Sequence, residues 1–360
     1  VQAVNMALAR ALENDDRVVV LGEDVGTDGG VFRATDGLAE RFGSKRVIDT
    51  PLAEGLIAGM SVGMAAAGLR PVAEIQFMGF IFPTIDQMGC HASRLRNRTR
   101  GRLTCPMVLR APYGGGVHAP EHHSESTEAM FAHIPGLRVV IPSSPRRAYG
   151  LLLSAIRDPD PVVFLEPKRL YRAITEDVTD DGKGLPLDKP FVLREGSDIT
   201  LVTWGAMTSE TLAAAEELAA SSLEAEVIDV ATLSPFDPTS ILASITKTGR
   251  CMIIHEAVRN SGFGAEVAAT IAEHGLLDLV APIKRITAPD TVVPLARLEE
   301  LEKMDEDGTL EAASKKQGAA YRRELRKIRR NLQGIRRMEK LPGVLFIVDQ
   351  QREGIAIKEA

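Results

Sequence analysis

The pattern of apolar and polar positions over residues 1–175 alternates between strand-like and helix-like stretches. Short apolar runs bounded by turn residues are typical of buried strands, and they occur here over residues 17–21, 72–77, 107–110, 137–141 and 162–165. Amphipathic stretches that fit helices lie between them, for example residues 84–98. This alternation predicts a parallel sheet with helices on both faces.

A second region of the same kind follows a polar stretch. Residues 175–190 are rich in Asp, Gly and Lys, which is typical of a linker. Beyond it the pattern predicts strands over 199–203, 226–230, 251–255 and 283–286, with helices over 209–220 and 264–274. We therefore expect an α/β protein with two parallel-sheet, three-layer domains and a helical-hairpin tail, divided into residues 1–175, a linker at 176–192, residues 193–297 and residues 298–360.

Residues 298–360 have a different distribution of charged residues. Residues 298–307 are strongly acidic, whereas 314–338 are basic and carry a narrow apolar stripe that predicts a helix. Eleven Lys and Arg against two Glu lie within 315–340, and residues 344–348 then fit a strand. Such a concentration of basic charge is typical of an RNA-binding segment.

Composition adds two limits. No stretch is both long enough and apolar enough to span a bilayer, so a membrane protein is not expected. The three cysteines, Cys90, Cys105 and Cys251, are scattered and form neither a disulfide framework nor a zinc-binding pattern. This cysteine usage favours a protein of the reducing cytoplasm.

Glu54 is the charged residue of greatest interest. It opens a stretch with no other charge before Arg70, and we expect Thr50 or Asp49 to cap a helix there with Pro51 in its first turn. Glycines at every fourth position leave one face open to close packing, and a helix that is apolar nearly all round is expected to be buried. Burial raises a carboxyl pKa, which suits proton transfer. A first-turn glutamate that only favours the helix dipole is equally consistent with this segment.

Longer segments carry a resemblance to a known family. They are residues 19–26, 74–80, 112–116, 121–126, 164–168, 233–237 and 289–291. With these segments in order, residues 1 to about 297 resemble the β subunit of the E1 component of 2-oxo acid dehydrogenase complexes, of the bacterial pyruvate or branched-chain type. The resemblance implies a pyrimidine-binding domain for thiamine diphosphate, followed by a transketolase C-terminal-like domain.

The resemblance also implies a set of cofactor-binding residues. Glu54 occupies the position of the family's catalytic glutamate, which hydrogen-bonds N1′ of the cofactor's aminopyrimidine, and a carboxyl group protonated near the working pH suits that contact. Leu52, Gln76 and Phe80 occupy positions that line the same pocket, where Phe80 would stack on the ring. From its residue type alone, Phe80 also fits an ordinary core position.

His123 matches a second catalytic position. In the family this histidine stabilises the intermediate and passes protons during acyl transfer to lipoamide, and histidine suits both tasks because it titrates near neutrality. The adjacent His122 is the alternative choice. Residues 114–116 are all glycine, which lets the preceding loop bend freely. His118 stands where most relatives carry arginine, and this departure bears on substrate preference or loop order.

The complete site is expected to need a second chain. The sequence lacks the family's Gly-Asp-Gly motif with following Asn residues, which binds the diphosphate through magnesium and lies on the α subunit in the family. The resemblance therefore implies an α2β2 assembly with an E1 α subunit. That assembly would decarboxylate a small 2-oxo acid and transfer an acetyl or 2-methylpropanoyl group to a lipoyl-bearing E2 acyltransferase. Asp158 and Asp160 match a loop that holds a structural potassium ion in some relatives, and they also fit a plain solvated turn.

Residues from about 298 to 360 resemble a different protein. They match a fragment of bacterial ribosomal protein S2, covering its helical hairpin and the strand that follows. The Arg-Leu-Glu-Glu stretch at 297–300 fits both families, so the join is not fixed within a few residues. Three readings stay open: an E1 β subunit with a foreign tail, a ribosomal RNA-binding fragment, and a chimera whose enzyme part folds without assembling.

Overall fold

The described part of the chain belongs to two compact units, Val1–Pro289 and Asp290–Ala360. The computed structural model describes residues 1–117, 121–291, 302–306, 308–309, 317–319, 321–323 and 325–326. In the second unit, residues 302–306 and the described pieces of the predicted helix at 314–338 are helical. The predicted strand at 344–348 and His118 lie outside the described residues. Within the described residues, no helix is long and apolar enough to cross a membrane.

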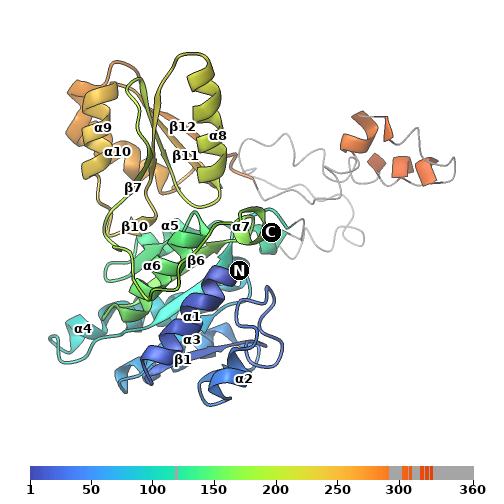
Figure 1. Ribbon diagram of the computed structural model, residues 1–360, viewed down its shortest axis with the longest axis vertical. Helices are drawn as coiled ribbons and strands as arrows, with labels where there is room; N and C mark the ends of the chain where they lie inside the picture. The colour runs from blue at the N-terminus through green and yellow to red at the C-terminus, as the bar shows by residue number, and fades with distance from the viewer. Residues whose placement is uncertain are drawn as a thin grey trace, which may run out of the picture. The chain divides into compact units, whose positions relative to one another are not determined.

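The first sheet has seven strands in the order β10-β5-β6-β4-β3-β1-β2. Figure 1 labels β10, β6 and β1 of this sheet. All of its neighbouring strands run parallel except β10, which pairs antiparallel with β5. The predicted α/β fold is therefore confirmed, and each apolar run predicted as a strand in this half is one. The strands are β1 (Val18–Gly22), β2 (Val47–Asp49), β3 (Arg70–Glu74), β4 (Val108–Tyr113), β5 (Arg138–Val140), β6 (Val162–Pro167) and β10 (Thr232–Ser234).

Alternating strand residues place a separate core on each face of this sheet. Val108 and Val162 pack with α1 (Gln2–Asn14) and α6 (Pro145–Arg157) on one face. The opposite face packs against α3 (Glu54–Ala66) and α5 (Glu128–Ala132), through residues that include Leu109 and Val163. The strands are buried on both faces, which is why they read as continuous apolar runs. Two short helices, α2 (Leu38–Phe42) and α7 (Leu170–Ala173), complete this half.

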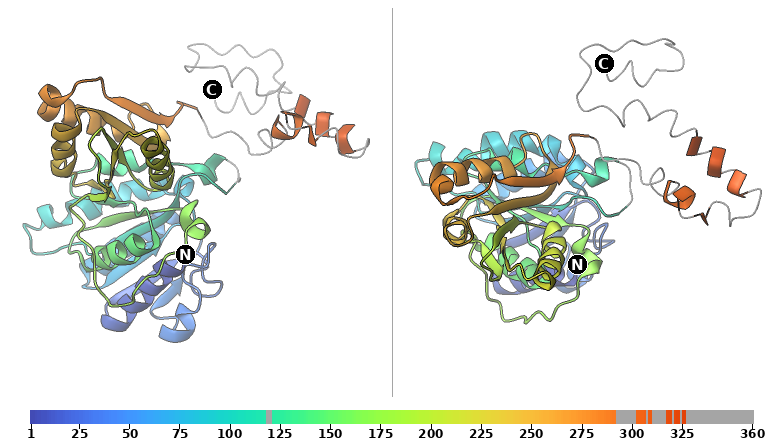
Figure 2. Two further views of the ribbon diagram at one scale, coloured as in Figure 1. Left: turned by 45° about the horizontal axis from the view of Figure 1, so that its top comes forward. Right: turned by 90° about the horizontal axis from the view of Figure 1, so that it is seen from above.

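The second sheet repeats the plan with five strands in the order β12-β11-β8-β9-β7. Its strands are parallel apart from β7, which runs antiparallel to β9. Helix α8 contacts one face, and α9 and α10 pack into the core on the other, as the views in Figure 2 show. The elements are β7 (Phe191–Arg194), β8 (Ile199–Thr203), α8 (Met207–Ala220), β9 (Ala225–Asp229), α9 (Thr239–Thr248), β11 (Cys251–Val258), α10 (Gly264–Gly275) and β12 (Lys284–Ala288).

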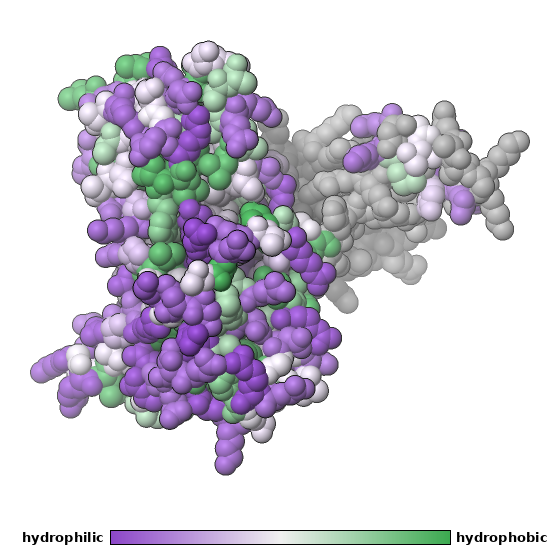
Figure 3. Space-filling view, in the orientation of Figure 1, coloured by the Kyte–Doolittle hydropathy of each residue, from purple (hydrophilic) through white to green (hydrophobic). Residues whose placement is uncertain are grey.

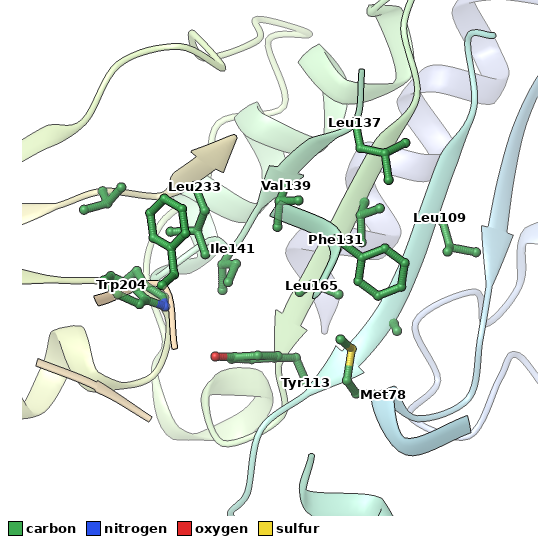
Figure 4. Close-up of a cluster of buried hydrophobic side chains, with 14 of the residues drawn as sticks. Met78, Leu109, Tyr113, Phe131, Leu137, Val139, Ile141, Leu165, Trp204 and Leu233 are labelled. Atoms are coloured by element: carbon green, nitrogen blue, oxygen red, sulfur yellow. The ribbon is translucent and has the colours of Figure 1, made fainter. Parts of the chain in front are cut away.

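The two sheets share one core. Strand β10 lies between strands of the second sheet in the sequence, but it pairs with β5 of the first sheet. A continuous apolar cluster runs from Leu165 through Ile141 to Trp204 and Leu233 (Figure 4). The predicted domain boundaries stay a prediction, but residues 232–234 belong structurally to the first sheet.

The helix predicted over residues 84–98 is confirmed, because every residue of this stretch has helical backbone, but it is not one regular α-helix. This segment is instead a series of short pieces: a 3-10 turn at Phe82–Thr84, a π-helical turn at Gln87–His91, a 3-10 turn at Ala92–Arg94 and α4 at Leu95–Arg98. The side chains of Ser93 and Arg94 both donate to the carbonyl of Gly89, each at 2.9 Å. Side chains that compete for a helix carbonyl in this way favour irregular turns.

A polar group lies inside the shared core. Glu128 is fully buried beside Tyr113 and Trp204, and in Figure 4 the Tyr113 hydroxyl is directed toward the side on which Trp204 lies. Burial raises the pKa of Glu128 to about 7, although its own backbone N–H, the Tyr113 hydroxyl and the Trp204 ring N–H oppose the rise. The folded protein therefore favours the protonated carboxyl group.

Replacing Glu128 with Gln is expected to change how stability depends on pH. Between pH 4.5 and 7 the unfolded chain releases a proton that the folded chain keeps, so the native protein loses stability as pH rises through this range. Gln cannot ionise, so the variant lacks this loss of stability. The unfolding free energy of Glu128→Gln minus that of the native chain should therefore be larger at pH 8 than at pH 4, by on the order of 3 kcal/mol. Urea unfolding at both pH values measures this, with the exposed Glu217→Gln as control. A difference between Glu128→Gln and the native chain that is the same at both pH values would show that folding does not raise the pKa of Glu128.

The face of the molecule in Figure 3 is mostly hydrophilic, with smaller apolar groups between the polar ones. Among the exposed large apolar residues of the described chain, Leu52 and Leu56 lie next to the position of greatest chemical interest.

Candidate active site

The candidate residues lie at one edge of the first sheet. Strands β1, β2, β3, β4 and β6 are parallel, so their carboxyl ends meet at the same edge. Glu23 follows β1, Glu54 follows β2, Gln76 follows β3, the glycines at 114–116 follow β4, and Lys168 follows β6. Ligands bind at this edge in open α/β sheets, so the topology brings the candidates to the expected place.

Glu54 is the first residue of α3, and the expected capping is wrong. The N-cap is Ala53, and no side chain caps the helix. Asp49 cannot cap it because its carboxylate accepts hydrogen bonds from the backbone N–H groups of Gly26, at 2.6 Å, and Thr27, at 3.0 Å, and from the Thr27 hydroxyl. Glu54 itself is half-buried rather than buried.

Within this single chain, helix α3 is buried on one side only, so the expected burial all round is not provided by the residues of this chain. Ile57, Ala58, Ser61 and Ala65 face the core, while Leu56 is 50% exposed. Leu52, just before the helix, is 78% exposed, and a side chain added at Gly63 would meet no atom within 4 Å. The apolar composition of the segment therefore leaves an open apolar surface beside Glu54.

Glu23 is a second carboxylate at this place, and the sequence analysis did not select it. It is buried, and its Oε1 has no hydrogen-bond partner among the described residues. Burial raises the pKa of Glu23, and the neighbouring charge of Glu54 raises it further. Its position directly after a buried strand was the available signal, since a carboxylate there falls at the ligand-binding edge.

His123 lies in a short 3-10 turn, Glu121–Ser124, packed against two aromatic rings. The ring centroids of His123 and Phe77 are 4.4 Å apart, and those of His123 and Phe80 are 5.3 Å apart, both in edge-to-face arrangements. The Nδ1 atom of His123 is buried without a hydrogen-bond partner in the described chain. The structure thus brings Phe80 and His123 together, whereas His122 is exposed.

A glycine sets how closely this turn approaches the sheet edge. A Cβ atom built on Gly79 would lie 1.8 Å from the carbonyl oxygen of His122 and 3.0 Å from its Cα. Real Cβ atoms do not approach a backbone so closely, so only glycine permits this contact.

Gly79→Ala is therefore expected to displace the turn that carries His123. Because the clash is with backbone, the turn rather than a flexible side chain has to move. We expect faster backbone hydrogen exchange at residues 121–125. We also expect the activity to fall by more than the loss of folding stability accounts for. Gly89→Ala is the matched control, since its nearest contact would be an ordinary 3.4 Å to a side-chain carbon of Ile134. Unchanged exchange in Gly79→Ala would contradict this expectation.

Lys168 is a further buried group near the same rings. Its Nζ lies 5.6 Å from the centroid of the Phe77 ring and has no hydrogen-bond partner within the described chain. Burial lowers the pKa of Lys168 to about 8, and the charges of Glu256 and Glu125 oppose that shift. Gln76, which was predicted to line the pocket, is half-buried and follows β3 at the same edge of the sheet.

Asp158 and Asp160 lie at the opposite end of β6 and are engaged by arginines. Asp160 accepts a hydrogen bond from Arg96 at 2.7 Å, and Asp158 forms an ion pair of 3.0 Å with Arg138. The Asp158 carboxylate also accepts the Asp160 backbone N–H at 2.8 Å, which is the geometry of an Asx turn. The potassium site stays a prediction.

Family models match the chain in three parts. The transketolase pyrimidine binding domain matches residues 1–174, the transketolase C-terminal domain matches 189–307, and ribosomal protein S2 matches 283–360. The last two matches overlap at 283–307, the region in which the join could not be fixed from the sequence. The chimeric character predicted for the chain is confirmed.

Curated relatives and solved structures extend these matches. The chain is 48% identical over 315 residues to the pyruvate dehydrogenase E1 component subunit beta of Bacillus subtilis (strain 168), covering 88% of this chain and 97% of the relative. The corresponding subunit of Acholeplasma laidlawii is 50% identical over 296 residues, covering 82% and 90%. A structure described as a split gene transketolase, inactive beta4 tetramer, has a TM-score of 0.69 with 23% identity, covers 83% and 91%, and shows the fold alone.

Proposed function

We propose a function from the premise that this chain belongs to the family of β subunits of the pyruvate dehydrogenase E1 component, and that its residues 283–360 are similar to ribosomal protein S2. It serves with an E1 α subunit as a thiamine diphosphate-dependent 2-oxo acid dehydrogenase whose substrate is pyruvate. The observation that carries this proposal is the 48% identity over 97% of the Bacillus subtilis subunit.

The residues at the sheet edge fit the pyrimidine half of the cofactor. Two neighbouring carboxyl groups, Glu54 and Glu23, supply polar atoms, as does Nδ1 of His123, which has no hydrogen-bond partner among the described residues. Phe80 supplies an aromatic ring next to His123. Bound thiamine diphosphate supplies the electron sink that decarboxylation of a 2-oxo acid requires. Glu54 would hold a proton at the aminopyrimidine. Burial, and then the neighbouring charge of Glu54, raise the pKa of Glu23 beside it.

His123 would act on the substrate side. Its ring is fixed by Phe77 and Phe80, so its nitrogens are oriented before substrate arrives, and a positioned histidine can donate and accept protons near neutral pH. We propose that it passes protons while the acyl group moves to the lipoyl group of an E2 acyltransferase.

The open apolar surface around Leu52 and Leu56 supports a site completed by another subunit. A large apolar group 78% exposed beside a catalytic carboxylate is unusual for a finished pocket, and covering it would exclude water from the reaction. We propose that the α subunit of an α2β2 assembly binds here and brings the magnesium and diphosphate site that this sequence lacks.

The test is reconstitution. The chain is mixed with a bacterial E1 α subunit, thiamine diphosphate, magnesium and either pyruvate or 3-methyl-2-oxobutanoate, and carbon dioxide release is followed. Turnover with pyruvate supports the proposal, and preferential turnover of the branched acid corrects the substrate. Co-purification with α but no turnover rejects the activity, and failure to co-purify favours a chimera that does not assemble.

A second function rests on the match of residues 283–360 to ribosomal protein S2 and on the basic charge of 315–340. We propose RNA contact by this tail. Binding to ribosomal RNA that weakens steeply with salt and disappears on truncation after residue 297 would support it. Binding that survives the truncation would reject it.

A further inference from the structure

Glu256 lies on the second sheet and contacts the edge of the first sheet at which the candidate residues lie. It lies on β11, and its Oε1 accepts a hydrogen bond from the backbone N–H of Gly115 at 2.5 Å. The other oxygen, Oε2, is buried without a hydrogen-bond partner among the described residues. A Cβ atom on Gly114 would lie 2.4 Å from that oxygen, so the carboxylate fits closely against the glycine backbone.

The glycine loop at 114–116 is held from both sides. Gly114 and Gly116 have φ values of +79° and +97°, which side chains rarely allow. A Cβ atom on Gly116 would lie 2.9 Å from the Cβ of Arg169, so this loop lies between Arg169 and Glu256. The backbone N–H of Gly114 donates to the carbonyl of Glu125 at 2.9 Å, which ties the loop to the residues just after His123.

A second connection runs through Lys168. This buried ammonium group has no hydrogen-bond partner in the described chain, and the charges of Glu256 and Glu125 act on it. It lies over the Phe77 ring, whose edge-to-face partner is His123. An isolated buried charge is costly, so nearby carboxylates stabilise Lys168 in this place.

We propose that Glu256 is a positioning residue for His123, acting through the glycine loop and through Lys168. Its carboxylate holds Gly115 in place and offsets the charge of Lys168, so that the turn Glu121–Ser124 and the Phe77 ring keep their places. The consequence for catalysis rests on the proposed function, whereas the structural link stands on its own.

Hydrogen exchange of the isolated full chain tests the link without any activity. Removing a charged hydrogen-bond partner in Glu256→Ala should speed exchange in peptides covering 113–117 and 121–131 by about 10- to 100-fold. Glu256→Gln keeps an oxygen that can accept the Gly115 N–H, so it should restore most of the protection and also serves if the alanine variant fails to fold. Glu266→Ala, an exposed position on α10 of the same region, is the control.

The outcomes separate this inference from the proposed function. Wild-type exchange in Glu256→Ala, or faster exchange spread equally over β8 and α10, would overturn the positioning role. In the enzyme reconstituted with α, a positioning role lowers kcat with little change in KM, and Glu256→Gln recovers most of it. An unchanged kcat in Glu256→Ala would overturn the role in catalysis. Absence of turnover with the unmodified chain would reject the proposed function, while the exchange result would still decide the structural link.

Discussion

Replacing Glu54 with Gln is expected to remove turnover from the enzyme reconstituted with an α subunit. Gln keeps the size and the hydrogen-bonding oxygen of Glu54 but cannot hold an ionisable proton. Positioned proton transfer contributes about 10²- to 10⁴-fold, so kcat should fall by at least about 100-fold. Carbon dioxide release at saturating thiamine diphosphate measures this loss.

The control for Glu54 has to exclude a simple effect on the helix dipole. Glu40 lies in the first turn of α2, as Glu54 does in α3, and it is exposed. If Glu54 only favoured the dipole, Glu40→Gln and Glu54→Gln would each cost about 0.3–1 kcal/mol of stability and leave kcat alone. Retained turnover in Glu54→Gln would therefore assign the residue to the helix and reject it as the catalytic acid.

The sequence predicts the central strands of the sheets well because these strands are buried on both faces. Runs such as 162–165 are apolar at every position, and only a strand covered on both sides needs that pattern. Strand β10 could not be predicted in the same way, since three residues carry little pattern and its partner β5 lies more than ninety positions earlier. The helix at 84–98 was predicted, but its division into 3-10, π and α turns was not, because side-chain competition for a backbone carbonyl leaves no mark in the apolar periodicity.

The candidate site shows a similar division. His123 lies in a segment that carries the family resemblance, and Glu54 occupies the position of the family's catalytic glutamate. Glu23 and Lys168 also lie in such segments, 19–26 and 164–168, but the resemblance gave them no role, and Glu256 lies in none of these segments. Each of these three reaches the site through topology, as the residue after a strand or as one near the end of a strand in the other sheet. Their partners lie up to 141 positions away along the chain, so local pattern could not have joined them.

Replacing His123 with Asn is expected to separate two stages of the reaction. Asn fills much of the ring's space but neither takes up nor releases a proton near neutral pH, so steps that move a proton at this position should slow by about 10²-fold or more. If His123 serves acyl transfer, reduction of lipoyl-E2 should fall further than decarboxylation measured with an artificial electron acceptor. Both rates are measured on the same reconstituted enzyme.

The neighbouring residue supplies the matched comparison for His123. His122 is exposed, whereas His123 contacts the Phe77 and Phe80 rings, so His122→Gln should retain both rates within about twofold. The opposite result, with His122→Gln inactive and His123→Asn active, would exchange their roles. Equal losses of both rates in His123→Asn would place this residue in decarboxylation as well, because a group used only in acyl transfer cannot slow a step that precedes it.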